Sequence, residues 1–301
     1  MHNAGPRLVY VSDKSPGLRR EGQAPAFHYQ TKAGRPLQDQ RHLARIRSLV
    51  IPPAWSDVWI APEPNAHLQA TGRDARGRKQ YIYHPQFREA REQTKFERLL
   101  EFVSVLPRIR TRVAADMRKS GLPREKVIAA VVSLLESTLI RVGNESYAKE
   151  NKSYGLTTLR NRHAEVQGAA IKFNFKGKSG RQWRLQMKDR RVANIVRAAQ
   201  ELPGQYLFQY EDGDGRPQAI TSADINDYLR DASGRDVTAK DFRTWAGTVL
   251  AAQSLAEIGA AGSETAAKRN LRAAIDIVSK RLGNTPTICR KCYVHPAILE
   301  G

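Results

Sequence analysis

The pattern of hydrophobic and polar positions changes near residue 90. Before that point, short apolar runs such as residues 7–11 and 58–62 are separated by Pro and Gly, which predicts strands joined by turns. One basic amphipathic stretch, residues 37–55, predicts a helix that stops at its two prolines. After residue 90 the apolar positions recur mainly at helical intervals. We therefore expect an α+β protein with a small, mainly β domain over residues 1–90 and a larger, mainly α-helical domain over residues 91–301.

Within the larger domain, two predicted elements present a basic residue at an end or a tip. Apolar residues at helical spacing between positions 127 and 139 predict a core helix, with Arg141 close behind its end. Residues 169–188 alternate apolar and polar positions around GKSG, which predicts a β-hairpin with Lys178 at its tip. A basic residue near a helix end is also a common complement of the helix dipole, so Arg141 alone indicates little.

The last third of the chain predicts two longer helices and a short one. Thr238 and Asp241 form an N-terminal cap for the first of them. Its buried face is predicted from four apolar residues: Phe242, Trp245, Val249 and Leu250. The second helix covers residues 264–282 and stops at Gly283, where a left-handed backbone is favoured. A turn then leads to a short helix that carries Tyr293.

The charge of the chain indicates a polyanionic partner. Fifty Lys and Arg against 30 Asp and Glu give a net charge of +20 and a pI near 10.2. An excess of this size favours nucleic acid, because bound cations release the counterions condensed on it. No apolar run reaches the roughly 18 residues of a membrane span, and the first residues lack the apolar core of a secretory signal. Two cysteines are too few for a disulfide scaffold, which favours an intracellular compartment.

Basic and aromatic residues alternate in GRDARGRKQYIYHP, near the end of the first domain. Guanidinium groups suit phosphates, and phenols suit phosphates or base edges. The candidate DNA-binding residues are Arg73, Arg76, Arg78, Lys79, Gln80, Tyr81 and Tyr83. The two tyrosines are spaced to share one face of a strand. An edge strand with ordinary tyrosine packing is the alternative.

The CxxC pair of Cys289 and Cys292 does not fit a metal or redox site. Structural zinc needs four ligands, and even with His295 the set has three. A redox pair would begin a helix after a thioredoxin-like βαβ pattern, which the sequence lacks. GKS at 177–179 imitates a phosphate-binding loop, but position 172 is Lys where that motif needs Gly, and a strand follows. We therefore expect no metal and no cofactor.

Five scattered residues together suit transesterification of a phosphodiester without metal: Arg141, Lys178, Arg243, Asn284 and Tyr293. Two guanidiniums can neutralise the extra negative charge of a phosphorane-like transition state. A lysine on a hairpin tip can give a proton to the leaving oxygen. A phenol can form a covalent phosphate ester, which keeps the bond energy needed for rejoining without ATP.

The chain resembles the type IB DNA topoisomerases, of the short poxvirus-like and bacterial kind. The resemblance rests on blocks in the right order: GRKQYIYHP, LIRVGNESYAKENKSYGLTTLRNRH, FKGKSGRQW, KDFRTWAGT and GNTPTICRKCYVHP. It implies that Tyr293 attacks the scissile phosphate, Arg141 and Arg243 hold its non-bridging oxygens, and Lys178 protonates the leaving oxygen. Asn284 stands where many members have His; its amide can still donate to a phosphate oxygen but carries no charge.

The resemblance also implies the partner, the architecture and the place of action. Double-stranded DNA is the substrate, held in a C-shaped clamp made by the two domains. One strand is nicked through a 3′-phosphotyrosyl intermediate, supercoils relax by strand rotation, and the strand is resealed without ATP or metal. We expect a monomer that acts in the cytoplasm on the nucleoid and has no membrane partner.

Two other functions explain part of the sequence. A tyrosine site-specific recombinase uses similar chemistry, but it usually presents a histidine-rich HxxR block around its second Arg, whereas Arg243 sits in DFRTW. A non-catalytic, basic DNA-binding protein would explain the charge and the Tyr/Arg strand alone. That second alternative predicts that replacing Tyr293 by Phe changes nothing.

Overall fold

The computed structural model describes residues 7–75 and 77–300, except for the side chains of residues 91–95. It divides the chain into two compact units, Met1–Phe96 and Glu97–Gly301, and the long helix α2 (Pro85–Asp116) runs through the division. Arg76, one of the candidate DNA-binding residues, lies outside the described residues. Within the described residues, no helix is both long and apolar enough to cross a membrane.

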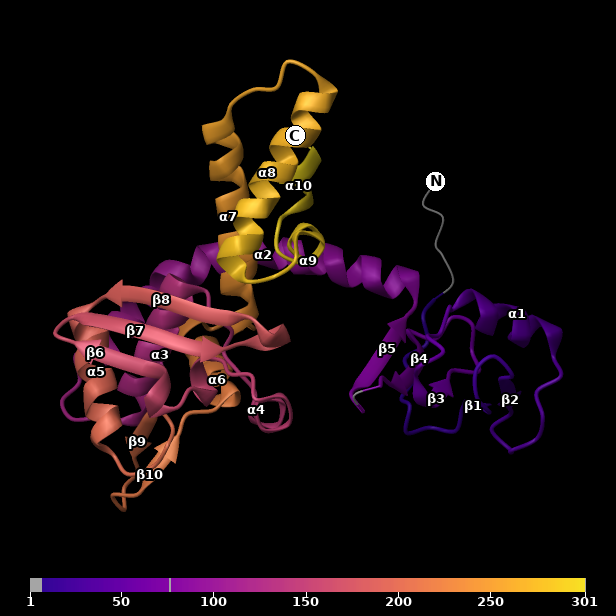
Figure 1. Cartoon of the computed structure of the whole chain (residues 1–301), viewed down its shortest axis with the longest axis horizontal. Coiled ribbons are helices and arrows are strands. Elements are labelled where there is room, and N and C mark those ends of the chain that lie inside the picture. The colour runs from indigo at the N-terminus through magenta and orange to yellow at the C-terminus, as the bar shows by residue number, and fades with distance from the viewer. Residues whose placement is uncertain (1–6, 76, 301) are drawn as a thin grey trace. The chain divides into compact units, whose positions relative to one another are not determined.

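The first unit is built on a five-stranded antiparallel sheet with the strand order β2-β1-β3-β4-β5 (Figure 1). Its elements are β1 (Leu18–Glu21), β2 (His28–Gln30), α1 (Gln40–Ser48), β3 (Ser56–Ile60), β4 (Leu68–Arg73) and β5 (Lys79–Tyr83). The strand predicted over residues 7–11 is wrong, because Val9 forms only an isolated bridge with Ala66. The predicted helix ends earlier than its prolines, since the chain turns to a positive φ at Val50.

The two faces of this sheet differ in chemistry. Leu18, Val58, Ile60 and Ala70 pack with Ile46 of α1 in a small hydrophobic core. Directly paired residues of neighbouring strands share a face. On the other face, such pairs form one row across four strands: Arg19, Trp59, Thr71 and Tyr81. We call this surface the tyrosine face.

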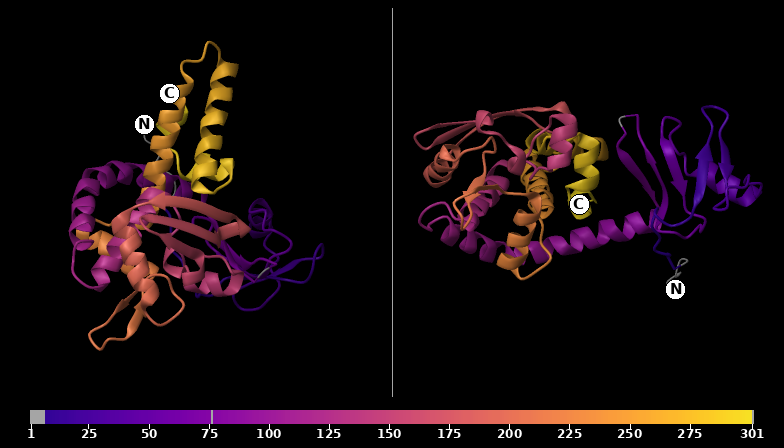
Figure 2. Two further views of the ribbon diagram at one scale, coloured as in Figure 1. Left: turned by 60° about the vertical axis from the view of Figure 1, so that its left-hand side comes forward. Right: turned by 90° about the horizontal axis from the view of Figure 1, so that it is seen from below.

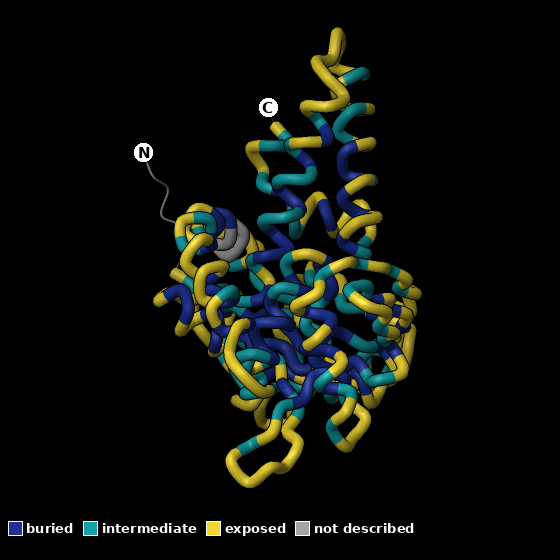
Figure 3. The backbone as a smooth tube through the Cα atoms, turned by 90° about the vertical axis from the view of Figure 1, so that its left-hand side faces the viewer, coloured by how far each residue is buried: buried dark blue, intermediate teal, exposed yellow. Residues whose placement is uncertain are grey.

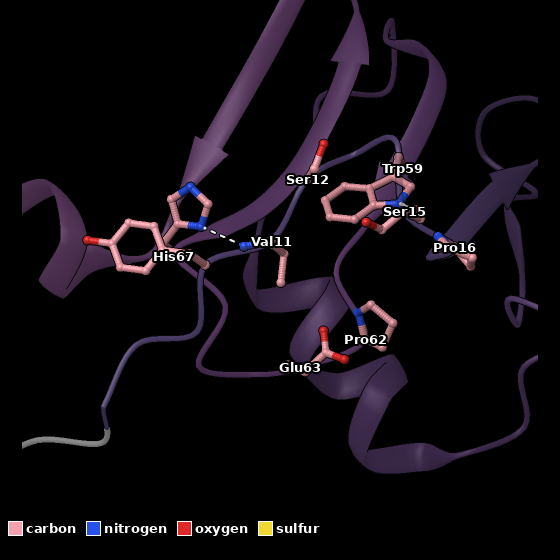
Figure 4. Close-up of a pocket in the computed structure, with 9 residues that line it drawn as sticks. Val11, Ser12, Ser15, Pro16, Trp59, Pro62, Glu63 and His67 are labelled. Carbon is pink, nitrogen blue, oxygen red and sulfur yellow. Dashed lines mark hydrogen bonds between the residues drawn. The ribbon is translucent and has the colours of Figure 1, made fainter.

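The chain before β1 crosses the sheet and encloses a pocket of about 580 Å³ (Figure 4). The main-chain N–H of Val11 donates to Nδ1 of His67 at 3.2 Å, and the His67 ring stacks on Tyr10 with 4.7 Å between centroids. Trp59 forms one wall, and Glu63 is the only carboxylate among the lining residues. Apart from His67, the lining residues include no basic side chain, so the pocket offers an anion neither a lysine nor an arginine.

The second unit combines helices with a three-stranded antiparallel sheet, β6-β7-β8 (Figures 1 and 2). In chain order its elements after α2 are α3 (Arg124–Thr138), α4 (Glu145–Asn151), β6 (Ala164–Gln167), β7 (Ala170–Lys176), β8 (Gln182–Lys188), α5 (Arg190–Glu201), β9 (Gln209–Glu211), β10 (Pro217–Ala219), α6 (Ser222–Ser233), α7 (Ala239–Ile258), α8 (Glu264–Leu282), α9 (Pro286–Cys292) and α10 (Pro296–Glu300). Short 3₁₀ turns cover Leu156–Thr158, Asn161–His163 and Lys178–Gly180. The predicted hairpin is β7 and β8, and β6 adds a third strand that the pattern did not indicate.

Helix α3 forms the centre of this unit. Its residues from Val127 to Val132 are all buried, as are Leu134 and Leu135. Buried stretches of the chain, dark blue, gather in the interior, and exposed stretches, yellow, lie at the periphery (Figure 3). A helix that is apolar on every side is a core helix. It packs with α2, α5, α6 and the inner face of β7, which contributes Ile171, Phe173 and Phe175. The rigid core therefore supports both the end of α3 and the hairpin.

Helices α7 and α8 lie side by side and form a second, smaller core with the end of the chain. The N-terminal cap of α7 is confirmed, since Thr238 and Asp241 form a capping box. Its predicted buried face is wrong in part, because Trp245, Val249 and Leu250 are only half-buried. The buried stripe of α7 consists largely of small and polar residues: Ala239, Phe242, Arg243, Thr244, Gly247, Thr248, Ala251 and Ser254.

Candidate active site

Two arginines from distant parts of the second unit converge on one asparagine. The Nη2 atom of Arg141 donates to Oδ1 of Asn284 at 2.8 Å, and Nη2 of Arg243 donates to the same oxygen at 2.7 Å. Neither guanidinium forms a salt bridge with a carboxylate in the described part of the chain. The arrangement therefore gathers two positive charges without an anion between them.

The end of α3 fixes Arg141. Leu139 takes a left-handed conformation with φ 59° and donates its N–H to the carbonyl of Leu135, which ends the helix. The carbonyl of Arg141 then accepts the N–H of Leu156 at 2.9 Å. A Cβ on Gly155 would lie 2.5 Å from that carbonyl oxygen, so the close approach requires glycine. The backbone of Arg141 is thus held from two sides.

Arg243 lies on the buried stripe of α7 and is only 4% exposed. Its guanidinium donates to the carbonyl of Leu139 and, at 2.7 Å, to that of Leu282. Its Nε is buried and has no hydrogen-bond partner among the described residues. Burial lowers the pKa of Arg141, and the positive charge of Arg243 lowers it further. Two like charges in a partly buried site favour a doubly held anion such as a phosphate.

Tyr293 lies beside this pair. It follows the last residue of α9 as its C-cap, rather than lying within the short helix as predicted, and donates its N–H to the carbonyl of Cys289 at 2.9 Å. The Cζ atom of Arg243 lies 5.2 Å from the centroid of its ring. The hydroxyl of Thr248, on α7, donates to the carbonyl of Tyr293 at 3.3 Å. The phenol is therefore anchored to α7 through its own backbone.

A glycine on α7 makes room for Tyr293. A Cβ on Gly247 would lie 2.5 Å from the carbonyl oxygen of Tyr293 and 3.0 Å from its Cβ. Gly247 and Thr248 were not among the residues predicted from the sequence to belong to the site. A signal was present, because glycine inside a helix costs about 1 kcal/mol relative to alanine and so indicates a close approach.

A Gly247→Ala variant is expected to displace Tyr293, because the added methyl overlaps the backbone of the tyrosine. It should thereby slow the DNA cleavage that the sequence resemblance implies for this tyrosine. Overpacking of this kind typically costs about 1–3 kcal/mol of stability. Single-turnover cleavage of a labelled duplex and thermal unfolding measure the two effects. Gly262→Ala is the matched control, since no heavy atom lies within 4 Å of its added Cβ. Equal cleavage rates in the two variants would contradict the expectation.

Lys178 lies on a different element from the two arginines and shares no hydrogen bond with them. It begins the 3₁₀ turn at the tip of the β7–β8 hairpin and is exposed, and none of the hydrogen bonds of Arg141, Arg243 or Asn284 goes to it. Its Nζ lies 5.8 Å from the centroid of the Tyr147 ring. The structure thus brings four of the five candidates together and leaves Lys178 on a neighbouring element.

The hairpin is nevertheless tied to the segment that carries Asn284. Nη2 of Arg181 donates to the carbonyl of Lys280 at 2.7 Å. A Cβ on Gly283 would lie 2.8 Å from the ring of Trp183. Gly283 has φ 65°, which confirms the predicted left-handed end of α8. The same glycine therefore ends the helix and lets the hairpin approach Asn284.

Of the two cysteines next to Tyr293, Cys289 is part of the small hydrophobic core at the end of the chain. Cys289 is fully buried with Leu282 and Val294, and burial raises the pKa of its thiol to about 11. A thiol with that pKa stays protonated near neutral pH, so it is a poor nucleophile and a poor metal ligand. Cys292 is half-buried.

The candidate DNA-binding residues of the first unit are held by acidic neighbours. Lys79 pairs with Asp13, and this contact lowers the pKa of the Asp13 carboxyl. Arg78 and Gln80 both donate to Oδ2 of Asp74, at 2.8 and 2.9 Å. The side chains are thus positioned by carboxylates.

Arg73 and the two tyrosines complete this set on the edge strand β5 and its neighbour β4. Nε of Arg73 lies 3.6 Å from Asp57. Tyr81, 48% exposed, stacks on Tyr83 with 6.0 Å between ring centroids and 8° between planes, so the two share a face as predicted. Aromatic rings on an exposed sheet edge offer stacking and polar contacts together.

Two guanidiniums, that of Arg243 buried and that of Arg141 half-buried, lie beside a phenol and an adjoining hairpin that carries a lysine. This arrangement suits phosphoryl transfer through tyrosine. Comparison with known families agrees. Residues 84–300 match the family described as eukaryotic DNA topoisomerase I, catalytic core, and residues 26–74 match the bacterial DNA topoisomerase IB N-terminal domain. The chain belongs to the type IB DNA topoisomerases.

Individual proteins with similar sequences carry the name of the same family. The chain is 32% identical to DNA topoisomerase 1B of Acanthamoeba polyphaga mimivirus, over 94% of this chain and 87% of the relative. It is 24% identical to DNA topoisomerase 1B of vaccinia virus (strain Copenhagen), over 79% and 73% of the two chains. The fold also has a distant likeness to the XerH site-specific recombinase bound to palindromic difH substrate, with 14% identity and a TM-score of 0.39 over 62% and 47% of the chains. That score decides nothing about activity.

Proposed function

We propose that Arg141, Lys178, Arg243, Asn284 and Tyr293 carry out the reaction of this type IB topoisomerase. The enzyme nicks one strand of duplex DNA through a 3′-phosphotyrosyl intermediate, lets supercoils relax by strand rotation, and reseals the strand without ATP or metal. The observation that carries the residue assignment is the convergence of the two guanidiniums on Asn284 beside the Tyr293 ring.

In the cleavage step, Oη of Tyr293 forms a bond to the scissile phosphorus as the bond from phosphorus to the 5′-oxygen breaks. The phenol gives its proton to solvent water, and the leaving 5′-oxygen takes a proton from the Lys178 ammonium, which becomes a neutral amine. Arg141 and Arg243 neutralise the charge that develops on the non-bridging oxygens. Resealing is the reverse of this step, with the 5′-hydroxyl as nucleophile.

The amide nitrogen of Asn284 can donate hydrogen bonds while its oxygen accepts from the two arginines. Both arginines bind Oδ1, and no group in the described chain accepts a hydrogen bond from Nδ2. An amide has two N–H donors on that nitrogen. Asn284 therefore orients the two guanidiniums and presents Nδ2 to a phosphate oxygen, without the charge that a histidinium would bring.

For the first unit we propose that residues 1–90 form the DNA-contact domain and that residues 91–301 form the catalytic domain. Arg73, Arg76, Arg78, Lys79, Gln80, Tyr81 and Tyr83 contact DNA in this proposal. The enzyme acts as a monomeric, C-shaped clamp around one duplex, in the cytoplasm and on the nucleoid. The net charge of +20 supports broad contact with the DNA backbone.

Relaxation of negatively and positively supercoiled plasmid, with EDTA present and ATP absent, tests the reaction. We expect relaxation of both signs, because strand rotation is driven by torque and the chemistry needs neither metal nor nucleotide. Activity that vanishes with EDTA and returns with Mg²⁺ would contradict the metal-free reaction. Relaxation of a single sign would contradict free rotation.

A further inference from the structure

A β-bulge on the tyrosine face directs one carboxylate toward two arginines. The register of β3 against β4 shifts between Ser56 and Trp59, so β3 carries an extra residue there. Asp57, in this bulge, has φ 51°, a left-handed value that non-glycine residues rarely take. Opposite the bulge, a Cβ on Gly72 would lie 2.7 Å from the ring of Trp55. Bulges commonly redirect a side chain for a purpose.

Asp57 lies in a cavity of about 190 Å³ that is rich in positive charge. Six charged residues line it: Lys14, Arg19, Arg73 and Lys79, with Asp13 and Asp57. The buried hydroxyl of Thr71, also in the lining, donates to Asp13 at 3.1 Å. Cations outnumber carboxylates by two, so the cavity can accept a further anion.

The ion pairs of Asp57 are loose. One carboxylate oxygen lies 3.7 Å from Nη1 of Arg19 and the other lies 3.6 Å from Nε of Arg73. Both distances exceed those of hydrogen bonds, and all three side chains are more than half exposed. Pairs of this kind contribute little to stability, about 0–1 kcal/mol. Because these pairs are loose and exposed, a DNA phosphate that reaches both guanidiniums with hydrogen bonds can replace the carboxylate between them.

We propose that this cavity binds a backbone phosphate of DNA through Arg19 and Arg73, and that Asp57 occupies the phosphate position until DNA arrives. The inference rests on the proposed DNA contact of β5 and extends it to β1 and β3, which that proposal did not include. Arg19 belongs to the same cross-strand row as Tyr81, and Arg73 lies directly opposite Lys79 in the register of β4 and β5. The cavity is therefore part of the tyrosine face. A guanidinium pair suits phosphate oxygens because each fork donates two bonds.

The salt dependence of binding tests this proposal on the full chain. The dissociation constant for a fluorescein-labelled duplex is measured by anisotropy at several salt concentrations, for the wild type and for Arg19→Gln. Losing one phosphate contact is expected to weaken binding and to reduce the slope of log K against log salt by about 0.9. Arg35→Gln, at an exposed site outside the cavity, removes the same charge and is expected to change the slope less. Equal slopes for Arg19→Gln and the wild type would overturn the site.

Asp57→Asn tests the carboxylate. It removes the charge while keeping the shape and the tolerance for a left-handed backbone, and binding is expected to tighten about two- to fivefold. Asp39→Asn is the matched control, because Asp39 is exposed, caps α1 and lies outside the cavity, and Asn also caps helices well. The same change in both variants would overturn the role of Asp57, since it would reflect net charge alone.

Two further arms separate the remaining outcomes. Inorganic phosphate at constant ionic strength is expected to narrow the difference between the wild type and Arg19→Gln, because it competes with the DNA phosphate for the same guanidiniums. A difference that phosphate leaves unchanged would overturn the cavity as an anion site. Tyr81→Ala is measured alongside and is expected to weaken binding. An unchanged Tyr81→Ala would contradict the proposed DNA contact of β5, whereas an unchanged Arg19→Gln beside a weakened Tyr81→Ala overturns the cavity alone.

Discussion

A Tyr293→Phe variant is expected to lose plasmid relaxation by at least about 10⁴-fold, since removal of a nucleophile takes away the covalent step itself. The substitution deletes a single oxygen. The ring beside Arg243 and the backbone bond from Thr248 do not need that oxygen, so folding and DNA affinity should change little. Relaxation, anisotropy binding and thermal unfolding measured on the same preparation separate these effects.

The covalent intermediate gives the more direct measurement. Wild-type protein denatured during reaction with a labelled duplex should retain a DNA strand through its 3′ end, and Tyr293→Phe should retain none. Tyr210→Phe is a matched control, since Tyr210 is half-buried on β9, outside the cluster around Asn284. A labelled adduct that persists in Tyr293→Phe would assign the nucleophile to another residue.

An Arg243→Ala variant is expected to slow single-turnover cleavage by about 10²–10³-fold, because it removes a preorganised donor from the developing charge on the phosphate. Arg243→Lys should recover part of the loss, because an ammonium keeps the charge but not the planar fork. The rate is measured with saturating enzyme over labelled duplex, so that weaker binding does not enter it. An unchanged rate would contradict the assignment.

Arg243 also supports the fold, which the experiment must separate from chemistry. Its bonds to the carbonyls of Leu139 and Leu282 join the end of α3 to the end of α8. Thermal unfolding of Arg243→Ala therefore belongs beside its rate. Arg281→Ala serves as control, because Arg281 likewise donates to a backbone carbonyl, that of Ser137, but from an exposed position. A slow Arg243→Ala that is as stable as Arg281→Ala would be a catalytic effect.

Local signals in the sequence were sufficient for several elements. Thr238 with Asp241 predicted the start of α7, and Gly283 predicted the end of α8. The alternation around GKSG predicted the β7–β8 hairpin. These features depend on hydrogen bonds and backbone preferences within a few residues, so they can be identified without the rest of the chain.

Other features depended on partners far along the chain. Apolar spacing assigned the buried side of α7 to Phe242, Trp245, Val249 and Leu250, and of these only Phe242 is buried. The buried stripe includes Arg243 and Thr248 because it faces the site. The run at residues 7–11 has strand composition, yet it finds only a bridge at Val9. Composition indicates how readily a segment forms a strand, while the available neighbours decide whether it does.

The sequence by itself determined the family and the order of its motifs, since these are written in short blocks of residue types. Only the tertiary structure decided that Arg141, 143 positions before Asn284, and Arg243, 41 positions before it, meet on one amide oxygen. The same holds for the carboxylate of Asp57 between Arg19 and Arg73. Contacts between residues so far apart in the sequence depend on how the core helices pack and on the register of the strands. No local pattern of residues encodes either of these.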